Sequence, residues 1–160
     1  MTAAIVLRDA APDEAAYLSA LAKRSKAHWG YSDDFMADCE AELTYSAQQL
    51  QDSQFDFVVL ENDTAVVGFY AIERLENGVF ELEAMFVEPR YIGTGIGRQL
   101  IEHALSKVAI LGGGSLVIQG DPNAVAFYEA AGGERIGSRE SGSVSGRMLP
   151  VFRIAIRNLL

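Results

Sequence analysis

The stretch VEPRYIGTGIGRQL, residues 87–100, places Gly93, Gly95 and Gly97 between a strand-like run and a helix-like run. Glycines at alternate positions let backbone N–H groups approach a ligand without interference from a Cβ atom. The N–H groups that open a helix have no intrahelical acceptor and lie at the positive end of the helix dipole. The stretch therefore predicts an anion-binding turn at the start of a helix.

Two well-known phosphate-binding loops fit this stretch poorly. A Walker A loop contains Gly-Lys-Ser or Gly-Lys-Thr, and the chain has neither. A dinucleotide-binding G-x-G-x-x-G loop would have its third glycine where this chain has Arg98, and it would follow the first strand of a β-α-β unit. A plain turn without a ligand is the third alternative, although three alternate glycines exceed what such a turn needs.

Hydrophobic periodicity and turn residues predict the elements around this turn. Strands are expected at 4–8, 55–61, 64–75, 77–87, 115–119, 133–139 and 149–158, and helices at about 12–27, 33–50, 95–110 and 121–131. The helix at 95–110 joins two strands, which should therefore be parallel. Residues 1–160 are expected to form one α/β domain, with a mostly antiparallel, twisted sheet of about seven strands and about four helices.

Several short signals support these elements. Asn77-Gly78 is a strong hairpin signal, Asn62-Asp63 is expected to form the preceding turn, and Ser32 is a plausible cap of the helix at 33–50. The segment 137–146 is rich in glycine and serine and is expected to be a flexible loop. The predicted order is β-α-α-β-β-β-α-β-α-β-β.

The formal net charge of −9 is unevenly distributed along the chain. Between Ala27 and Glu73 there are ten acidic residues and no lysine or arginine. Nucleic-acid binding needs a basic footprint, so this function class is excluded. The acidic segment is expected to form a solvated surface, and steering of a cationic partner is the alternative.

Three features bear on the compartment. No apolar run approaches the length that crosses a bilayer, so no membrane association is expected. The N-terminus MTAAIVLRDA lacks the basic start and long apolar stretch of a secretory signal. Cys39 is the one cysteine, so it forms no internal disulfide and fits a reducing compartment. Together these features predict a cytoplasmic protein.

The segment Arg90-x-x-Gly93-x-Gly95, preceded by LEAMFVEP and followed by IGRQLIEHAL, resembles the signature of the GNAT N-acetyltransferase superfamily. NAVAFYEAAGG, residues 123–133, resembles the second motif of that family. The order of elements is similar over nearly the whole chain, which implies a GNAT-like fold. KAHWGYSDDFM, residues 26–36, further resembles a bacterial subgroup of uncharacterised members. The resemblance implies acetyl-CoA as the cosubstrate and no metal.

In this family the glycine turn binds the pyrophosphate of coenzyme A, and the strand before it splays away from its parallel neighbour. The resemblance therefore implies that the N–H of Val87 faces the thioester. Asn123 is expected to bind the pantetheine arm, and a role in helix capping is the alternative. The coenzyme-binding candidates are Met85, Val87, Arg90, Ile92, Gly93, Thr94, Gly95, Ile96, Gly97, Arg98 and Asn123.

Three residues are candidates for catalysis. The resemblance makes Tyr128 the general acid that protonates the leaving thiolate, and a tyrosine that simply packs is the alternative. Glu81 and Glu83 alternate on one strand, so they are expected to share a face with Met85 and Val87. A partly desolvated carboxylate has a raised pKa and can take a proton through water. Glu83 is favoured as the base because it is closer to Met85, and ordinary exposed carboxylates are the alternative.

The acceptor candidates are His28, Trp29, Tyr31, Arg139 and Arg147. The first three lie between the first two predicted helices, where the family lines its acceptor pocket, although core aromatics are the alternative for Trp29 and Tyr31. The two arginines flank the Gly/Ser loop and could grip a carboxylate or phosphate. The acidic segment points instead to a cationic acceptor, and the sequence leaves both open.

The resemblance implies an acetyl-CoA-dependent N-acetyltransferase acting on a small-molecule or peptide primary amine. Cys39 lies in an acidic stretch that would raise its pKa, so direct transfer in a ternary complex is expected. The alternatives are a protein N-terminal acetyltransferase and a catalytically silent acyl-CoA-binding or sensor domain. His28 and His103 are too isolated to make a metal site. Many family members pair through such sheets, which makes a homodimer one alternative for the assembly.

Overall fold

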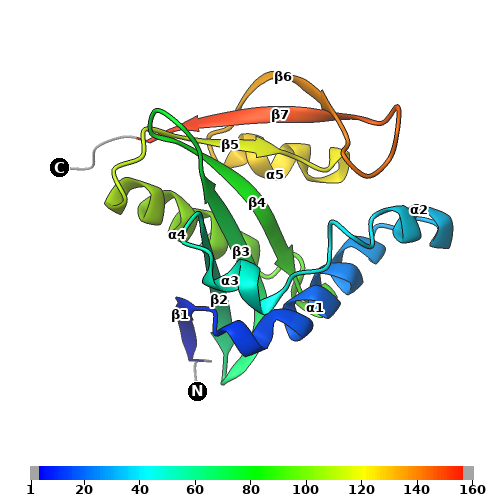
Figure 1. The fold of residues 1–160 in the computed structure, drawn as a ribbon, viewed down its shortest axis with the longest axis horizontal. Coiled ribbons are helices and arrows are strands. Elements are labelled where there is room, and N and C mark those ends of the chain that lie inside the picture. Colours follow the sequence, from blue (N-terminus) through cyan, green and yellow to red (C-terminus); the bar gives the residue numbers. More distant parts are fainter. Residues whose placement is uncertain (1–3, 157–160) are drawn as a thin grey trace.

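The computed structural model describes residues 4–156, which build a seven-stranded sheet with helices on both faces (Figure 1). The strand order is β1-β2-β3-β4-β5-β7-β6, and among these neighbours β4 and β5 alone are parallel. The strands are β1 Ile5–Asp9, β2 Phe55–Asn62, β3 Ala65–Arg74, β4 Val79–Val87, β5 Ser115–Gln119, β6 Glu134–Glu140 and β7 Met148–Ala155. The helices are α1 Ala15–Ala27, α2 Asp33–Asp38, α3 Ala47–Gln51, α4 Ile96–Ile110 and α5 Val125–Ala130, with 3-10 turns at Pro12–Glu14, Pro89–Tyr91 and Pro122–Ala124. The predicted fold class is confirmed.

Two tight turns connect β2, β3 and β4 into an antiparallel meander. Asn77 and Gly78 have positive φ angles of 59° and 74°, as a two-residue hairpin turn of type I′ requires. The turn between β2 and β3 is centred on Asp63 and Thr64, whose φ angles are 50° and 72°. It therefore lies one residue later than the Asn62-Asp63 turn predicted from the sequence.

Helices on the two faces of the sheet bury two separate core clusters. On one face, α4 buries Leu100 and Ile101 against a cluster that includes Tyr70 of β3. On the other face, α1 buries Leu18 and Leu21 in a cluster with residues of β2 and β3. The sheet is thus covered on both sides, and a ligand can enter it where two strands separate.

The sheet opens between β4 and β5. These strands pair from Val79 to Leu82 only, whereas β4 continues along β3 as far as Val87. Figure 1 shows β4 and β5 diverging beyond their paired ends. The structure therefore confirms the predicted parallel pair, and it leaves residues 83–87 without a described strand on the β5 side.

The predicted helix at 33–50 is wrong, because the segment forms two short helices, α2 and α3. Ser32 caps α2 as predicted, and Ser46 caps the second helix in the same way. The turns between them bury three side chains in the cluster on the α1 side: Cys39, Leu43 and Tyr45. Burial of these side chains against α1 overrides the local helical pattern.

The loop predicted at residues 137–146 is shorter in the structure, because residues 137–140 belong to β6. Ser141 Oγ accepts hydrogen bonds from the N–H groups of Ser143 and Val144, and the Ser143 hydroxyl donates to Glu42. The segment expected to be flexible is therefore held by hydrogen bonds. The predicted last strand, 149–158, is β7 as far as Ala155, and its last two residues lie outside the described residues.

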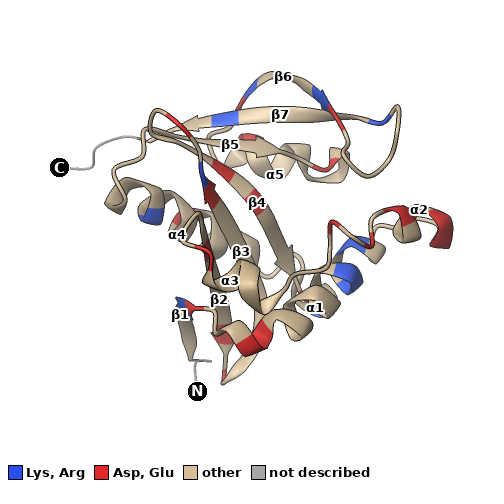
Figure 2. Cartoon of the chain, in the orientation of Figure 1, with Lys and Arg blue, Asp and Glu red and all other residues tan. Residues whose placement is uncertain are grey.

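Charge follows the predicted segregation along the chain. Figure 2 shows acidic residues on α2 and on the central strands, with basic residues on α1 and on β6 and β7. Asp33 and Asp34 occupy the first turn of α2, where they stabilise the positive end of the helix dipole. None of the helices described at residues 4–156 is long and apolar enough to cross a membrane.

Candidate functional site

A cavity of about 470 Å³, here called the main cavity, lies where β4 and β5 diverge. Its walls come from the end of α1, the open edge of β4, the turn before α4, the connection from β5 to α5, and the start of β7. The predicted site residues that line it are Trp29, Glu83, Met85, Val87, Ile92, Gly93, Gly95, Gly97, Arg98, Asn123, Tyr128 and Arg147. The fold thus brings together most of the residues that the sequence singled out.

The glycine turn leads into α4 without a side-chain cap. Gly93 and Gly95 have φ angles of 83° and 92°, a region that other residues rarely adopt. A Cβ atom at either position would meet nothing within 4 Å, so the space beside the turn is open. The first turn of α4 also contains no acidic residue, and the free N–H groups of a helix start favour an anion there.

Gly97 is constrained differently from the other two glycines. A Cβ atom at Gly97 would lie 3.3 Å from the ring of Phe127, on α5. This glycine therefore permits close packing of α4 against α5, next to the cavity wall.

The open edge of β4 presents backbone N–H groups to the main cavity. The Glu88 N–H donates to the Val67 carbonyl at 2.8 Å, toward β3, whereas the Val87 N–H points away from β3 and lies 3.4 Å from Ser25 Oγ. Because backbone groups alternate sides along a strand, the Met85 N–H also points away from β3. A separation of 3.4 Å is long for a hydrogen bond, so the Val87 N–H is only weakly held.

Tyr128 lies on α5 and lines the main cavity with a side chain that is 8% exposed. Its ring is confined by Phe152, with ring centroids 5.9 Å apart, and by Gly120, where a Cβ atom would lie 3.1 Å from the ring. Burial raises the pKa of the Tyr128 phenol, and the negative charge of Asp121 adds to this. The phenol is therefore protonated at neutral pH and can act as a proton donor.

Glu83 occupies a β-bulge in β4. The β3–β4 register pairs Ala71 with Ala84 but Ile72 with Leu82, so Glu83 is an extra residue in its strand. A bulge breaks the strict alternation of side chains between the two faces of a sheet.

The prediction that the two glutamates share a face with Met85 and Val87 is therefore wrong. Met85 and Val87 pack on the cluster under α4, whereas Ala84 is buried in the cluster on the α1 side. Glu81 and Glu83 do lie together, because one carboxylate oxygen of each falls within 4.8 Å of the other and of Glu73. Glu83 still lines the main cavity together with Met85, since both lie on the stretch of β4 that has left β5.

Glu83 has a strongly perturbed carboxyl group. The Glu83 side chain is exposed where it lines the cavity, but partial burial of its carboxyl group, followed by the negative charges of Glu73 and Glu81, raises the pKa of Glu83 to about 7. Arg139 partly compensates this acidic group, because its guanidinium Nη1 lies 2.7 Å from the Glu81 carboxylate. A carboxyl group with a pKa near 7 can exchange protons at neutral pH.

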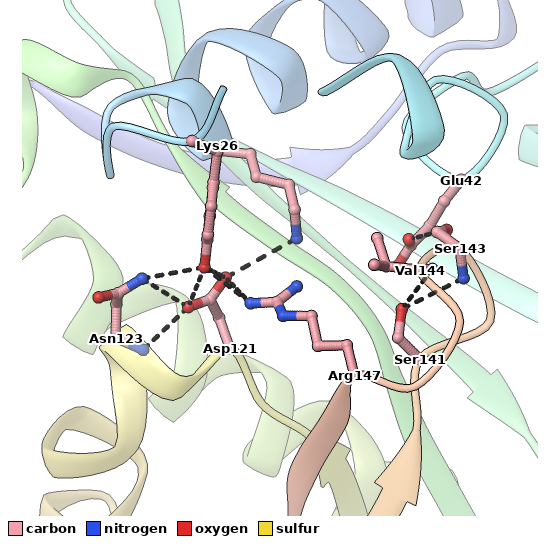
Figure 3. A network of polar contacts seen from close by, with 9 residues as sticks. Lys26, Glu42, Asp121, Asn123, Ser141, Ser143, Val144 and Arg147 are labelled. Carbon is pink, nitrogen blue, oxygen red and sulfur yellow. Dashed lines mark hydrogen bonds and ion pairs between the residues drawn. The ribbon is translucent and has the colours of Figure 1, made fainter. Parts of the chain in front are cut away.

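A network of polar contacts, which we call the clasp, joins Lys26, Tyr31, Asp121, Asn123 and Arg147 (Figure 3). The Tyr31 hydroxyl donates to Asp121 at 2.8 Å and accepts from Arg147 Nη2 at 2.8 Å. Arg147 Nη2 and Lys26 Nζ lie 3.6 Å and 3.8 Å from Asp121 Oδ2. The clasp ties the end of α1 and the residues after it to the start of α5 and the loop before β7.

Asn123 is engaged within the clasp rather than free. Its side-chain Nδ2 donates to Tyr31 at 3.0 Å and to Asp121 at 2.9 Å, and its backbone N–H donates to Asp121 at 2.8 Å. Burial opposes the ionisation of Asp121, but the hydrogen bonds from Asn123 and Tyr31 outweigh it and lower the pKa of Asp121. Asp121 is thus the capping residue of the turn before α5.

The predicted site residues that do not line the main cavity are His28, Tyr31, Glu81, Arg90, Thr94, Ile96 and Arg139. The side chain of Ile96, the first residue of α4, is buried in the core, so only its backbone can reach a ligand at the glycine turn. The Arg90 guanidinium stacks over the ring of Tyr91, at 5.1 Å from the ring centre. His28 is exposed and contacts the edge of Trp29.

A second cavity of about 490 Å³ adjoins the main cavity beneath the loop of residues 141–147. The two cavities share Glu42, Leu82, Glu83, Gln119 and Leu149. Glu81 lines the second cavity, which therefore contains three glutamates. Of these three, Glu42 alone belongs to the acidic segment between Ala27 and Glu73 that the sequence predicts, so part of the charge of that segment lies beside the main cavity.

The polar residues at this site that sequence reasoning missed include Ser25, Lys26, Glu73 and Asp121. Ser25 follows the buried stripe of α1, so helical periodicity could have placed it against the sheet. Asp121 was recognised only as part of a helix start, which is its local role. Lys26 and Glu73 carry no local signal, because their site contacts are to distant segments.

Comparisons with known proteins identify the family and the fold of the chain. Residues 21–143 match the family described as the acetyltransferase (GNAT) domain. None of the curated proteins compared with the chain matches it.

Several solved structures share the fold at low sequence identity. The PaiA N-acetyltransferase of Thermoplasma acidophilum, solved in complex with coenzyme A, is 18% identical, with a TM-score of 0.77 over 95% of this chain and 99% of that one. A GCN5-related N-acetyltransferase from Rhodopseudomonas palustris is 19% identical, with a TM-score of 0.75 over 97% and 96% of the two chains. An aminoglycoside 6′-N-acetyltransferase complexed with coenzyme A is 17% identical, with a TM-score of 0.72 over 95% and 97%.

Proposed function

Since the chain belongs to the GNAT acetyltransferase family, we propose that it is an acetyl-CoA-dependent N-acetyltransferase that acts on a primary amine by direct transfer in a ternary complex. The observation that carries this proposal is the course of the main cavity. It extends from the glycine turn before α4, along the open edge of β4, to Glu83 and Tyr128. An anion site, backbone donors and two proton-transfer groups therefore share one cavity.

The glycine turn fits the diphosphate of acetyl-CoA. The open space beside Gly93 and Gly95 admits a bulky anion, and the uncapped start of α4 offers N–H groups to it. Two proteins of the same fold were solved with coenzyme A. Acetyl-CoA supplies the activated acetyl group as a thioester.

The N–H groups of Met85 and Val87 are the proposed donors to the thioester carbonyl oxygen. Donors that are fixed in a backbone need no reorganisation as negative charge develops on that oxygen. The Val87 N–H gives up only a weak contact with Ser25, at 3.4 Å, when it binds the oxygen.

Glu83 is the proposed base. An aliphatic amine has a pKa of about 10, so it reaches the cavity mostly as an ammonium ion at neutral pH. Because the pKa of Glu83 is about 7, its carboxylate can take one ammonium proton, directly or through water, and pass it to solvent.

Tyr128 is the proposed acid. The bond from the amine nitrogen to the acetyl carbon forms as the C–S bond breaks, and the phenol gives its proton to the departing sulfur. The second proton lost by the nitrogen restores the phenol. The raised pKa of Tyr128 keeps the donor protonated beforehand.

Cys39 supports direct transfer by its surroundings. Its side chain is 1% exposed and packs in the cluster on the α1 side, and burial raises the pKa of the thiol. It is not among the residues that line the main cavity. An acetyl-cysteine route would need an exposed thiolate in that cavity.

The proposal is tested by incubating the protein with acetyl-CoA and a panel of small amines and of peptides with free N-termini. We expect amine-dependent release of thiol and an acetylated product identified by mass spectrometry. Transfer to peptides alone would favour a protein N-terminal acetyltransferase. Tight binding of acetyl-CoA by calorimetry without transfer to any amine would overturn the proposal and favour a sensor domain.

A further inference from the structure

The clasp contains more positive than negative charge. Lys26 and Arg147 share a single carboxylate, that of Asp121, although their side chains are only 13% and 18% exposed. Both basic residues also line the main cavity. Partly buried cations that share one counter-charge are costly, and a second anion from a ligand would stabilise them.

The two basic groups retain unused hydrogen-bond donors. Among the described residues, the Lys26 ammonium has its nearest acidic partner at 3.8 Å, which is beyond hydrogen-bond distance. Arg147 has five N–H donors, and the structure gives the side chain one hydrogen bond, from Nη2 to Tyr31 at 2.8 Å. Figure 3 shows the Lys26 and Arg147 side chains both reaching Asp121, and the two charged groups approach the same carboxylate oxygen, Oδ2.

Aromatic rings hold these groups in place. Tyr31 and Phe35 stack with ring centres 4.1 Å apart, and the Arg147 guanidinium carbon lies 5.2 Å and 4.7 Å from them. The Lys26 ammonium lies 5.8 Å and 5.9 Å from the same two ring centres. Cation–π contacts of this kind fix the cations while leaving their N–H groups free to bind a ligand.

Another part of the wall of the main cavity carries negative charge. Glu42 and Glu83 line it together with Lys26 and Arg147. A ligand with one negative and one positive group would therefore meet complementary charge at two parts of one cavity, which favours it over a ligand that has only one of them.

We propose that the acceptor is an amino carboxylate, a molecule with a primary amine and a carboxylate, such as a free amino acid. Arg147 and Lys26 bind its carboxylate, and its amine faces Glu83. This inference rests on the proposed N-acetyltransferase function. It also gives different roles to the two arginines that flank the Gly/Ser loop. Arg147 binds the acceptor, whereas Arg139 is bound to Glu81 at 2.7 Å and is not among the residues that line the main cavity.

The first test compares acceptors that differ only in the carboxylate. The wild-type protein is assayed with the common L-amino acids, with their carboxamides and with the corresponding decarboxylated amines. For the best amino acid we expect kcat/KM to exceed that of its carboxamide by about 10- to 100-fold, the range of a charge-assisted hydrogen-bonded pair. Transfer to the neutral carboxamides or amines at equal or higher kcat/KM would overturn this inference while leaving the proposed function intact. Absence of transfer to any amine would instead defeat the proposed function.

The second test asks whether Arg147 and Lys26 recognise the carboxylate. In Arg147→Gln and Lys26→Gln the ratio of kcat/KM for the acid to that for its carboxamide should fall toward one, mainly through a higher KM for the acid. Arg153→Gln is the matched control, because Arg153 is an exposed arginine of β7 outside the cavity, and its ratio should stay at the wild-type value. Equal losses for acid and carboxamide would show that the clasp is only structural and would overturn the assignment. Calorimetry with coenzyme A and circular dichroism report whether each variant is folded.

Discussion

The backbone N–H of Val87 lies 3.4 Å from the Oγ of Ser25, so a weak hydrogen bond joins α1 to the open edge of β4. The Ser25 side chain is buried and lines the main cavity. This contact places a hydroxyl beside the donor that we assign to the thioester oxygen. It also predicts what removal of that hydroxyl should do.

Ser25→Ala should change turnover by no more than about threefold, because the contact it removes is weak and the Val87 N–H stays in place. Ser19→Ala is the contrasting variant on the same helix, since the Ser19 hydroxyl accepts from the Tyr45 N–H at 2.8 Å. Loss of that acceptor leaves a buried N–H unpaired and should cost about 1–3 kcal/mol in the free energy of unfolding, with little effect on turnover. Denaturant titration and steady-state kinetics measure both. A hundredfold loss of turnover in Ser25→Ala would mean that the hydroxyl itself acts in the reaction.

Tyr128→Phe should lower kcat by about 10²- to 10⁴-fold, the usual contribution of a general acid, and leave the affinity for acetyl-CoA nearly unchanged. Tyr70→Phe is a control, because Tyr70 is also buried but is not among the residues that line the main cavity. Steady-state kinetics and calorimetry with acetyl-CoA distinguish the two variants. Wild-type turnover in Tyr128→Phe at every pH would remove this residue from the mechanism.

The raised pKa of Glu83 predicts how the rate of the reaction depends on pH. The base must be ionised, so kcat/KM should rise with pH through an apparent pKa of about 7 and then level off. Glu83→Gln should abolish this rise. Glu73→Gln removes the neighbouring charge that contributes most to the shift after burial, so it should move the apparent pKa to a lower value. A pH profile that Glu83→Gln leaves intact, but Glu81→Gln abolishes, would reassign the base to Glu81.

The raised pKa of Glu83 also makes the stability of the folded protein depend on pH. The folded state raises the pKa of Glu83 above that of the unfolded chain, so it favours the protonated form. The contribution of Glu83 to stability is therefore greatest below the unfolded pKa and falls as pH rises toward 7. Glu83→Gln should have a higher Tm than the wild-type protein at pH 8, and this difference should shrink at pH 4. Thermal melts at the two pH values test this expectation.

Gly95→Asp should weaken the binding of coenzyme A more than 100-fold, because the new carboxylate would lie next to a bound diphosphate. Gly95→Asn is the matched control, since asparagine has the same size, lacks the charge and tolerates positive φ about as well. It should lose less than about tenfold in affinity by the same reasoning about charge. Calorimetry with coenzyme A measures both, and equal losses in the two variants would attribute the effect to backbone strain alone.

Much of the fold was predictable because its signals are local. The Asn77-Gly78 hairpin, the Ser32 cap and the strand at Ser115–Gln119 depend on backbone preferences and on periodicity within a few residues. The family was recognisable for the same reason, since the glycine turn is a contiguous motif, and the match over residues 21–143 agrees with that resemblance.

The wrong predictions came from tertiary contacts. The helix expected at 33–50 divides because its middle packs against α1, and the bulge at Glu83 exists only in the register between β3 and β4. Because of the bulge, Met85 and Val87 lie on the α4 side of the sheet and, contrary to the prediction, do not share a face with the two glutamates. Neither feature is encoded by periodicity within the segment itself.

The sequence by itself determined the glycine turn, the strand order of the meander and the residue types available for anion binding and proton transfer, because each follows from contiguous residues. The tertiary structure alone decided which of the charged groups act together. Tyr31 meets Asp121, Asn123 and Arg147 across separations of 90 to 116 residues. Glu83 reaches a pKa of about 7 because the fold partly buries its carboxyl group and brings Glu73 and Glu81 beside it. Charge interactions and burial depend on distance in space, and the fold of the chain sets those distances.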